Sequence, residues 1–122
     1  MIACAAIAVA VVGCTPQPLP VFDREQTAAD RLDVGDLDVG IEPDSVRALG
    51  EEEGISYFTG KTSDEKICLI TMSKEFDGPS ASCSDSLGIA VREGSGPLVE
   101  LVAEGARRTG GHWIGDHLWV SD

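Results

Sequence analysis

The chain has 122 residues, a formal net charge of −12 and an aromatic content of 5%. This length suits one domain with one core rather than two. The acidic balance argues against nucleic acid or an anionic lipid surface as a binding partner, because both would repel the domain. The small number of aromatic residues predicts a small core that benefits from a covalent crosslink.

The N-terminal segment from Ile2 to Gly13 carries no charge and consists almost entirely of Ala, Val and Ile. Its length is typical of the apolar region of a signal peptide, and it is shorter than the roughly twenty residues that span a bilayer. No Lys or Arg precedes Arg24, so we expect translation to start upstream of Met1. The alternative is a longer apolar helix that is not cleaved and acts as an anchor.

The apolar segment ends in Val11-Val12-Gly13-Cys14, and a polar, proline-rich stretch follows. This pattern resembles the lipobox of bacterial lipoproteins. The resemblance implies that the Cys14 sulfur receives a diacylglycerol, that the chain is cut just before Cys14, and that the new N-terminus is acylated. Two or more acyl chains anchor a protein stably, so we expect membrane lipid as a partner and the extracytoplasmic face of the cell membrane as the location. The expected organisation is a signal peptide over 1–13, a tether over 14–22 and one domain over 23–122.

Cysteine usage agrees with an exported domain. Cys4 would be removed with the leader, and Cys14 would carry the lipid, which leaves Cys68 and Cys83 as an even set in an oxidising compartment. We therefore predict a Cys68–Cys83 disulfide. Its loop of about fifteen residues would be worth roughly 3 kcal/mol in the chain-entropy model.

The first element that we expect is a short helix over 23–32. Asp23 is the predicted N-cap, and Gln26 stands at the capping-box position. An irregular acidic loop follows over 33–40.

The rest of the chain has the pattern of short strands separated by glycines. Segments 46–49 and 55–59 flank Gly50-Glu-Glu-Glu-Gly54, which predicts a hairpin with a charged tip. Segment 66–72 is apolar on both faces, so we expect a central strand that is covered on both sides. The remaining expected strands are a return over 81–84, alternating strands over 87–91 and 99–103, and residues 112–120 as a tight hairpin turning at Gly115-Asp116 or as one bent strand.

These elements predict a mainly β (α+β) fold. We expect a small curved antiparallel sheet of about six to seven short strands with the one N-terminal helix.

Two histidines are the only candidate bases for catalysis or metal binding. Zinc could draw on Cys68, Cys83, His112 and His117, but the cysteines are too far apart for the usual ligand spacing. A hydrolase would need a nucleophile and an oriented base, and the chain has no Gly-x-Ser-x-Gly elbow. We therefore expect no catalytic residue, no metal and no cofactor. A small envelope metal-binding protein or hydrolase that uses His112 and His117 is the alternative.

Acidic residues offer a further alternative, a calcium site. Asp33, Asp36 and Asp38, or Glu51 to Glu53, supply hard oxygen ligands, but their spacing is not that of an EF-hand. A solvated acidic loop or turn is the plainer interpretation.

Aromatic residues are the candidates for a binding face. Tyr57, Trp113 and Trp119, with Phe58, combine contact area with polar groups, as glycan- and peptide-binding surfaces do. The same residues are also the scarce large side chains that a small core needs. The predicted function is a non-catalytic binding or envelope module on the membrane, with an envelope protein or a glycan as its partner.

Overall fold

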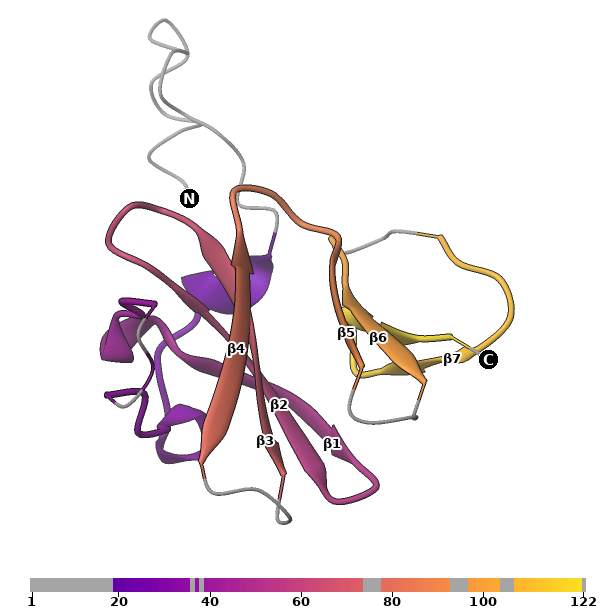
Figure 1. The fold of residues 1–122 in the computed structure, drawn as a ribbon, viewed down its shortest axis with the longest axis horizontal. Coiled ribbons are helices and arrows are strands. Elements are labelled where there is room, and N and C mark those ends of the chain that lie inside the picture. The colour runs from indigo at the N-terminus through magenta and orange to yellow at the C-terminus, as the bar shows by residue number, and fades with distance from the viewer. Residues whose placement is uncertain are drawn as a thin grey trace, which may run out of the picture.

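Four consecutive strands form a first antiparallel sheet in the computed structural model, which describes residues 19–35, 37, 39–73, 78–92, 97–103 and 107–121 (Figure 1). The strands are β1 (Arg47–Glu52), β2 (Ile55–Lys61), β3 (Ile67–Ser73) and β4 (Pro79–Ser84), and they pair in chain order. The expected hairpin with a charged tip is therefore present. Its turn is made by Glu53 and Gly54, both at positive φ, as a type I′ hairpin turn requires.

A second sheet of four strands follows. Its strands are β5 (Ile89–Arg92), β6 (Leu98–Leu101), β7 (His112–Ile114) and β8 (Leu118–Val120). Their order in the sheet is β5-β6-β8-β7, so the chain leaves β6, forms the outer strand β7, and returns to pair β8 with β6. The C-terminal segment is thus the tight hairpin and not one bent strand.

The mainly β prediction is correct, but the single curved sheet is not, because the strands divide into two sheets. The reason lies in β3, whose residues Ile67 to Thr71 are all buried. One isolated sheet would leave one apolar face of this strand in water. The second sheet covers one face of β3, and the segment before β1 covers the other (Figure 1).

Two hydrophobic clusters therefore lie on opposite faces of the first sheet. Leu69 on β3 belongs to the cluster between the two sheets, and its neighbour Ile70 belongs to the cluster beneath the N-terminal segment. Both side chains are fully buried. Leu19 is also fully buried between the sheets, so the chain is held to the core from this residue onward.

The two sheets also meet at their edges. Strand β1 lies beside β7, and β4 lies beside β5, so the sandwich is closed on both sides. The approach of β1 to β7 depends on Gly50, where an added Cβ would lie 2.5 Å from Cγ2 of Ile114. A β-bulge between Ala48 and Gly50 accompanies this contact.

The helix expected over 23–32 does not form. The N-terminal segment instead contains short 3₁₀ turns, η1 (Pro20–Asp23), η2 (Ala28–Asp30) and η3 (Pro43–Ser45). Gln26, predicted to close a capping box with Asp23, instead donates hydrogen bonds to the carbonyls of Pro43 and Val46. An isolated helix of this length is marginal in water, so long-range contacts decide the conformation.

Asp30 fastens this segment to the first sheet. Its carboxylate oxygens lie 2.5 and 2.7 Å from the guanidinium nitrogens of Arg24. They also accept hydrogen bonds from the backbone and hydroxyl of Thr27 and from the backbone N–H of Ala48 on β1. The bonds from Arg24 and these donors hold the pKa of this buried carboxyl well below its usual range. The capping box is thus Thr27–Asp30, four residues later than predicted.

Candidate functional site

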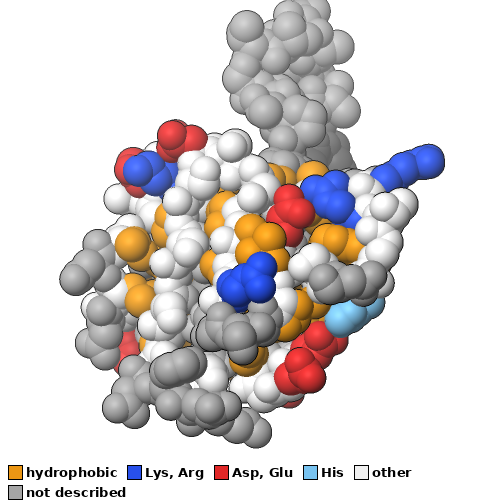
Figure 2. Space-filling view, turned by 45° about the vertical axis from the view of Figure 1, so that its right-hand side comes forward, with side chains coloured by type: hydrophobic (Ala, Val, Ile, Leu, Met, Phe, Trp, Pro, Cys, Tyr) orange, Lys and Arg blue, Asp and Glu red, His pale blue; other side chains and the backbone are white. Residues whose placement is uncertain are grey.

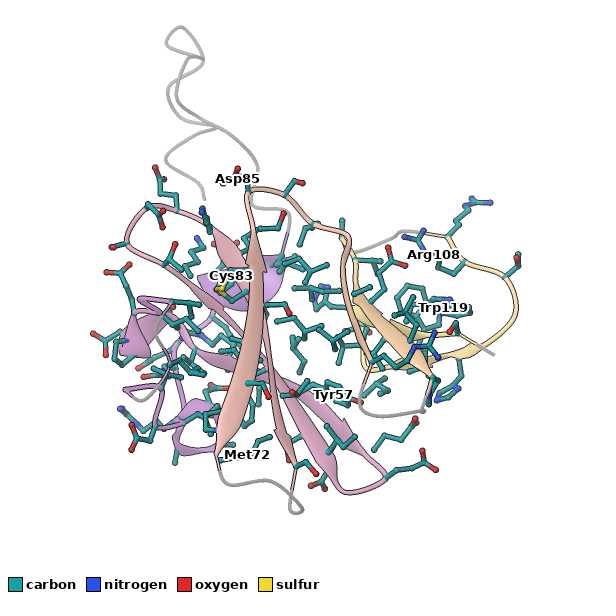
Figure 3. All side chains as sticks on the ribbon, viewed as in Figure 1. Tyr57, Met72, Cys83, Asp85, Arg108 and Trp119 are labelled. Atoms are coloured by element: carbon teal, nitrogen blue, oxygen red, sulfur yellow. A yellow bond between two sulfur atoms is a disulfide. The ribbon has the colours of Figure 1, made fainter. Side chains whose placement is uncertain are left out.

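Cys68 and Cys83 form a disulfide, as the cysteine count predicted. The two residues are direct partners in the register of β3 and β4, with a Cα–Cα distance of 4.0 Å. Cys68 is fully buried in the cluster beneath the N-terminal segment, and Figure 3 shows the bond beside the labelled Cys83. The crosslink therefore ties edge strand β4 to the most buried strand of the sheet.

The leader and Cys14 lie outside the described residues, so the lipobox remains a sequence-based prediction. Within the described part of the chain, every helix is too short or too polar to cross a bilayer.

His112 lies at the open end of the β7–β8 hairpin. Its Nε2 is 2.8 Å from each carboxylate oxygen of Glu52, so the pair joins β7 to β1 across the closed edge of the sandwich. The His112 side chain is 54% exposed. Figure 2 shows a histidine against carboxylates at the lower right of the face that it presents.

His117 lies at the opposite end of the same hairpin, in the turn between β7 and β8. Its side chain is buried, and its Nδ1 has no hydrogen-bond partner among the described residues. The hairpin register pairs His112 with Val120 and Ile114 with Leu118, so the two histidines are separated by the length of the hairpin.

The zinc hypothesis loses two of its four candidate ligands in this arrangement. Both cysteines of the zinc hypothesis are used in the disulfide. Over the described residues, no three His, Cys, Asp or Glu side chains are grouped so that they could hold a metal ion. Of the calcium candidates, Asp33 accepts a hydrogen bond from the backbone of Gly35, and Asp36 and Asp38 lie outside the described residues.

The aromatic candidates are divided between different faces. Trp113 and Trp119 are paired across β7 and β8 with ring centroids 5.3 Å apart in an edge-to-face arrangement. Trp113 is 37% exposed, whereas Trp119 is nearly covered. Tyr57 lies between the sheets (Figure 3), and Phe58 lies in the cluster on the other face of the first sheet. The structure therefore brings the two tryptophans together and separates both from Tyr57.

The segment before β7 lies close to Trp119, the covered member of the tryptophan pair. Gly111 is at φ +59°, and a Cβ there would lie 2.0 Å from the carbonyl oxygen of Val120 and 2.9 Å from Cζ2 of Trp119. Arg108 in this segment pairs with Glu100 on β6 at 3.1 Å. The outer face of the second sheet thus presents the exposed indole of Trp113, and the Arg108–Glu100 pair lies on the other side of Trp119 from it.

A pocket between the two sheets is the site that the sequence analysis missed. It has a volume of about 190 Å³ and opens beside the tip of the β1–β2 hairpin. Its wall on the second sheet is a row of three valines, because the register aligns Val91 with Val99 and Val99 with Val120. Ile55 and Tyr57 face this row from the first sheet.

The valine row explains why a pocket lies at this end of the sandwich. The next inward-facing row of the same sheet is Ile89, Leu101, Leu118 and Ile114, whose longer side chains belong to the inter-sheet core. Shorter side chains at three adjacent positions leave space that the larger residues fill elsewhere. The alternation of apolar residues was visible in the sequence, but the alignment of the valines depends on strand pairing.

No family model matches this chain, and neither the curated proteins nor the solved structures include a significant match to it.

Proposed function

We propose that this protein is a lipoprotein on the extracytoplasmic face of a bacterial cell membrane, and that its folded domain binds a ligand without catalysing a reaction. The Cys68–Cys83 disulfide is the observation that carries the location, because such crosslinks persist in oxidising compartments. The lipobox-like segment ending at Cys14 supports the same location.

Two structural features support a binding role. The outer face of the second sheet presents Trp113, and the pocket between the sheets has an apolar wall with carboxylates at its mouth. Apolar cavities with a few placed polar groups are the usual form of small-molecule sites. An envelope protein or a glycan as partner remains part of the proposal for the outer face.

The competing proposal is a metal-binding protein or a hydrolase based on His112 and His117. It has less support, because His112 is paired with Glu52 and the other histidine is buried at the far end of the hairpin. Replacing both histidines with glutamine separates the proposals. A binding module keeps its ligand, whereas a histidine-dependent enzyme or metal protein loses its activity or metal.

The location is tested by the intact mass of the protein extracted from membranes, with metabolic labelling by a fatty acid. We expect a chain that starts at Cys14, carries acyl chains, and exposes two alkylatable thiols only after reduction. Cys14→Ser should abolish labelling, and Cys4→Ser, inside the predicted leader, is the matched control that should leave it unchanged. An unlabelled chain in the cytosol with free Cys68 and Cys83 would refute the proposal.

A further inference from the structure

The pocket between the sheets combines an apolar interior with an acidic mouth. Its interior is formed by Ile55 and Tyr57 on one side and by the valine row of 91, 99 and 120 on the other. The mouth carries Glu52 and Glu53 from the tip of the β1–β2 hairpin. Among the described residues that line it, none is a lysine or an arginine.

The two carboxylates at the mouth differ in their contacts. Glu52 is held by His112 at 2.8 Å. Glu53 is exposed, lies at φ +52° in the turn, and forms no hydrogen bond or ion pair with any part of the chain that the structure describes. Among the described residues, no Lys or Arg side chain pairs with this negative charge at the rim of the pocket.

We propose that this pocket binds a small apolar cation, a primary amine that carries one aromatic or branched-alkyl group. The apolar group enters the space beside the valine row, and the ammonium stays at the mouth beside Glu53. The volume of about 190 Å³ suits one ring with a short chain, since a cavity of about 150 Å³ accommodates benzene in another protein. Carboxylates at the mouth disfavour anions of the same shape. This assignment rests on the proposed binding function and names its ligand class.

The test uses isothermal titration calorimetry with the full, lipidated chain in nanodiscs of zwitterionic lipid, and empty nanodiscs serve as the blank. The probe is 2-phenylethylamine, and 3-phenylpropionate is the anion of similar shape. We expect saturable binding of the amine and binding of the anion that is at least about tenfold weaker.

Variants at the hairpin tip separate charge from shape. Glu53→Gln should weaken amine binding by about threefold and reduce the preference over the anion, because an exposed charge pair is worth little more than this. Glu51→Gln is the matched control. Glu51 lies at the same tip, but its carboxylate accepts a hydrogen bond from the Ser56 hydroxyl and does not line the pocket. Val99→Phe, which fills the pocket, should abolish binding, and its thermal unfolding reports whether it folds.

Each outcome decides the proposal. Absence of saturable amine binding to correctly lipidated, disulfide-bonded protein refutes the ligand class and leaves the membrane location intact. Equal binding of amine and anion, or an equal loss in Glu51→Gln and Glu53→Gln, refutes the role of the acidic mouth. Failure of lipidation would instead refute the proposed location, and the same titration with the chain that carries no lipid would then decide the ligand class.

Discussion

Replacing Asp30 with asparagine should destabilise the domain by about 2–3 kcal/mol. The carboxylate is buried and accepts hydrogen bonds from Arg24, from Thr27 and from the backbone of Ala48. Asparagine keeps one acceptor oxygen, but it loses the charge and presents N–H donors to other donors. Loss of a fully buried partner costs about 3–5 kcal/mol. The Arg24 side chain is 42% exposed, which lowers the expected cost.

The assay is urea denaturation followed by tryptophan fluorescence, with wild type and Asp30→Asn at neutral pH. Asp23→Asn is the matched control, because Asp23 is a nearby exposed aspartate in η1. We expect the control to change the free energy of unfolding by less than about 0.5 kcal/mol. If Asp30→Asn behaves like this control, the carboxylate does not fasten the N-terminal segment to β1.

The pH dependence follows from the lowered pKa of Asp30. A carboxyl whose pKa is lower in the folded state contributes stability that is fully present above its unfolded value, near 3.9, and is lost as the pH falls through the folded-state value. Asp30→Asn has no such titration. The difference in unfolding free energy between wild type and variant should therefore shrink as the pH is lowered below about 4. A difference that stays constant down to acid pH would contradict this assignment.

Three further predictions concern other parts of the fold. Reducing the Cys68–Cys83 disulfide should cost about 3 kcal/mol, measured as a shift of the urea midpoint with and without reductant; an unchanged midpoint would contradict it. Gly111→Ala should lower the melting temperature more than Gly40→Ala. Both glycines have positive φ, but only at Gly111 would the added Cβ lie within 2.0 Å of backbone. Equal effects of the two substitutions would refute the steric argument. His117→Leu should leave stability unchanged or raise it by about 1 kcal/mol, since the buried Nδ1 has no hydrogen-bond partner in the described part of the chain. A clear loss of stability in calorimetric melting would mean that the imidazole makes a stabilising contact.

Local patterns in the sequence predicted most of the individual strands. The doubly apolar segment 66–72 corresponds to β3, and the Glu-Glu-Gly tip makes the β1–β2 turn. The disulfide followed from cysteine parity. These predictions succeed because side-chain alternation and turn chemistry depend on a few neighbouring residues, and the disulfide depends only on the number of cysteines left to pair.

The expected helix over 23–32 shows where local rules fail. Gln26 has the capping-box position of the expected helix and Asp30 lies near its expected end, but both side chains make contacts with residues about twenty positions away. The hydrogen bonds to Ala48 and Val46 replace those that a short helix would offer. Sequence periodicity does not contain these long-range partners.

The candidate sites were also predictable only in part. Val91 and Val99 lie in segments that were expected to alternate, and Val120 ends the segment 112–120. The alignment of these three valines as one row, opposite Tyr57, requires the order β5-β6-β8-β7. Trp113 and Trp119 were predicted as candidates, and the hairpin register placed them in contact. Their separation from Tyr57 could not be seen in the sequence, because Tyr57 lies on a different sheet.

The sequence by itself determined most of the segments that become strands, the doubly apolar character of β3, and which cysteines pair. The tertiary structure alone decided that the eight strands of the described residues divide into two sheets, that β8 and not β7 joins β6, and that a pocket remains beside the acidic hairpin tip. The physical reason is the range of the forces. Backbone preference and alternation act between neighbouring residues. The division into two sheets depends instead on burying both faces of β3, and the pocket depends on the sizes of side chains that only strand pairing brings together.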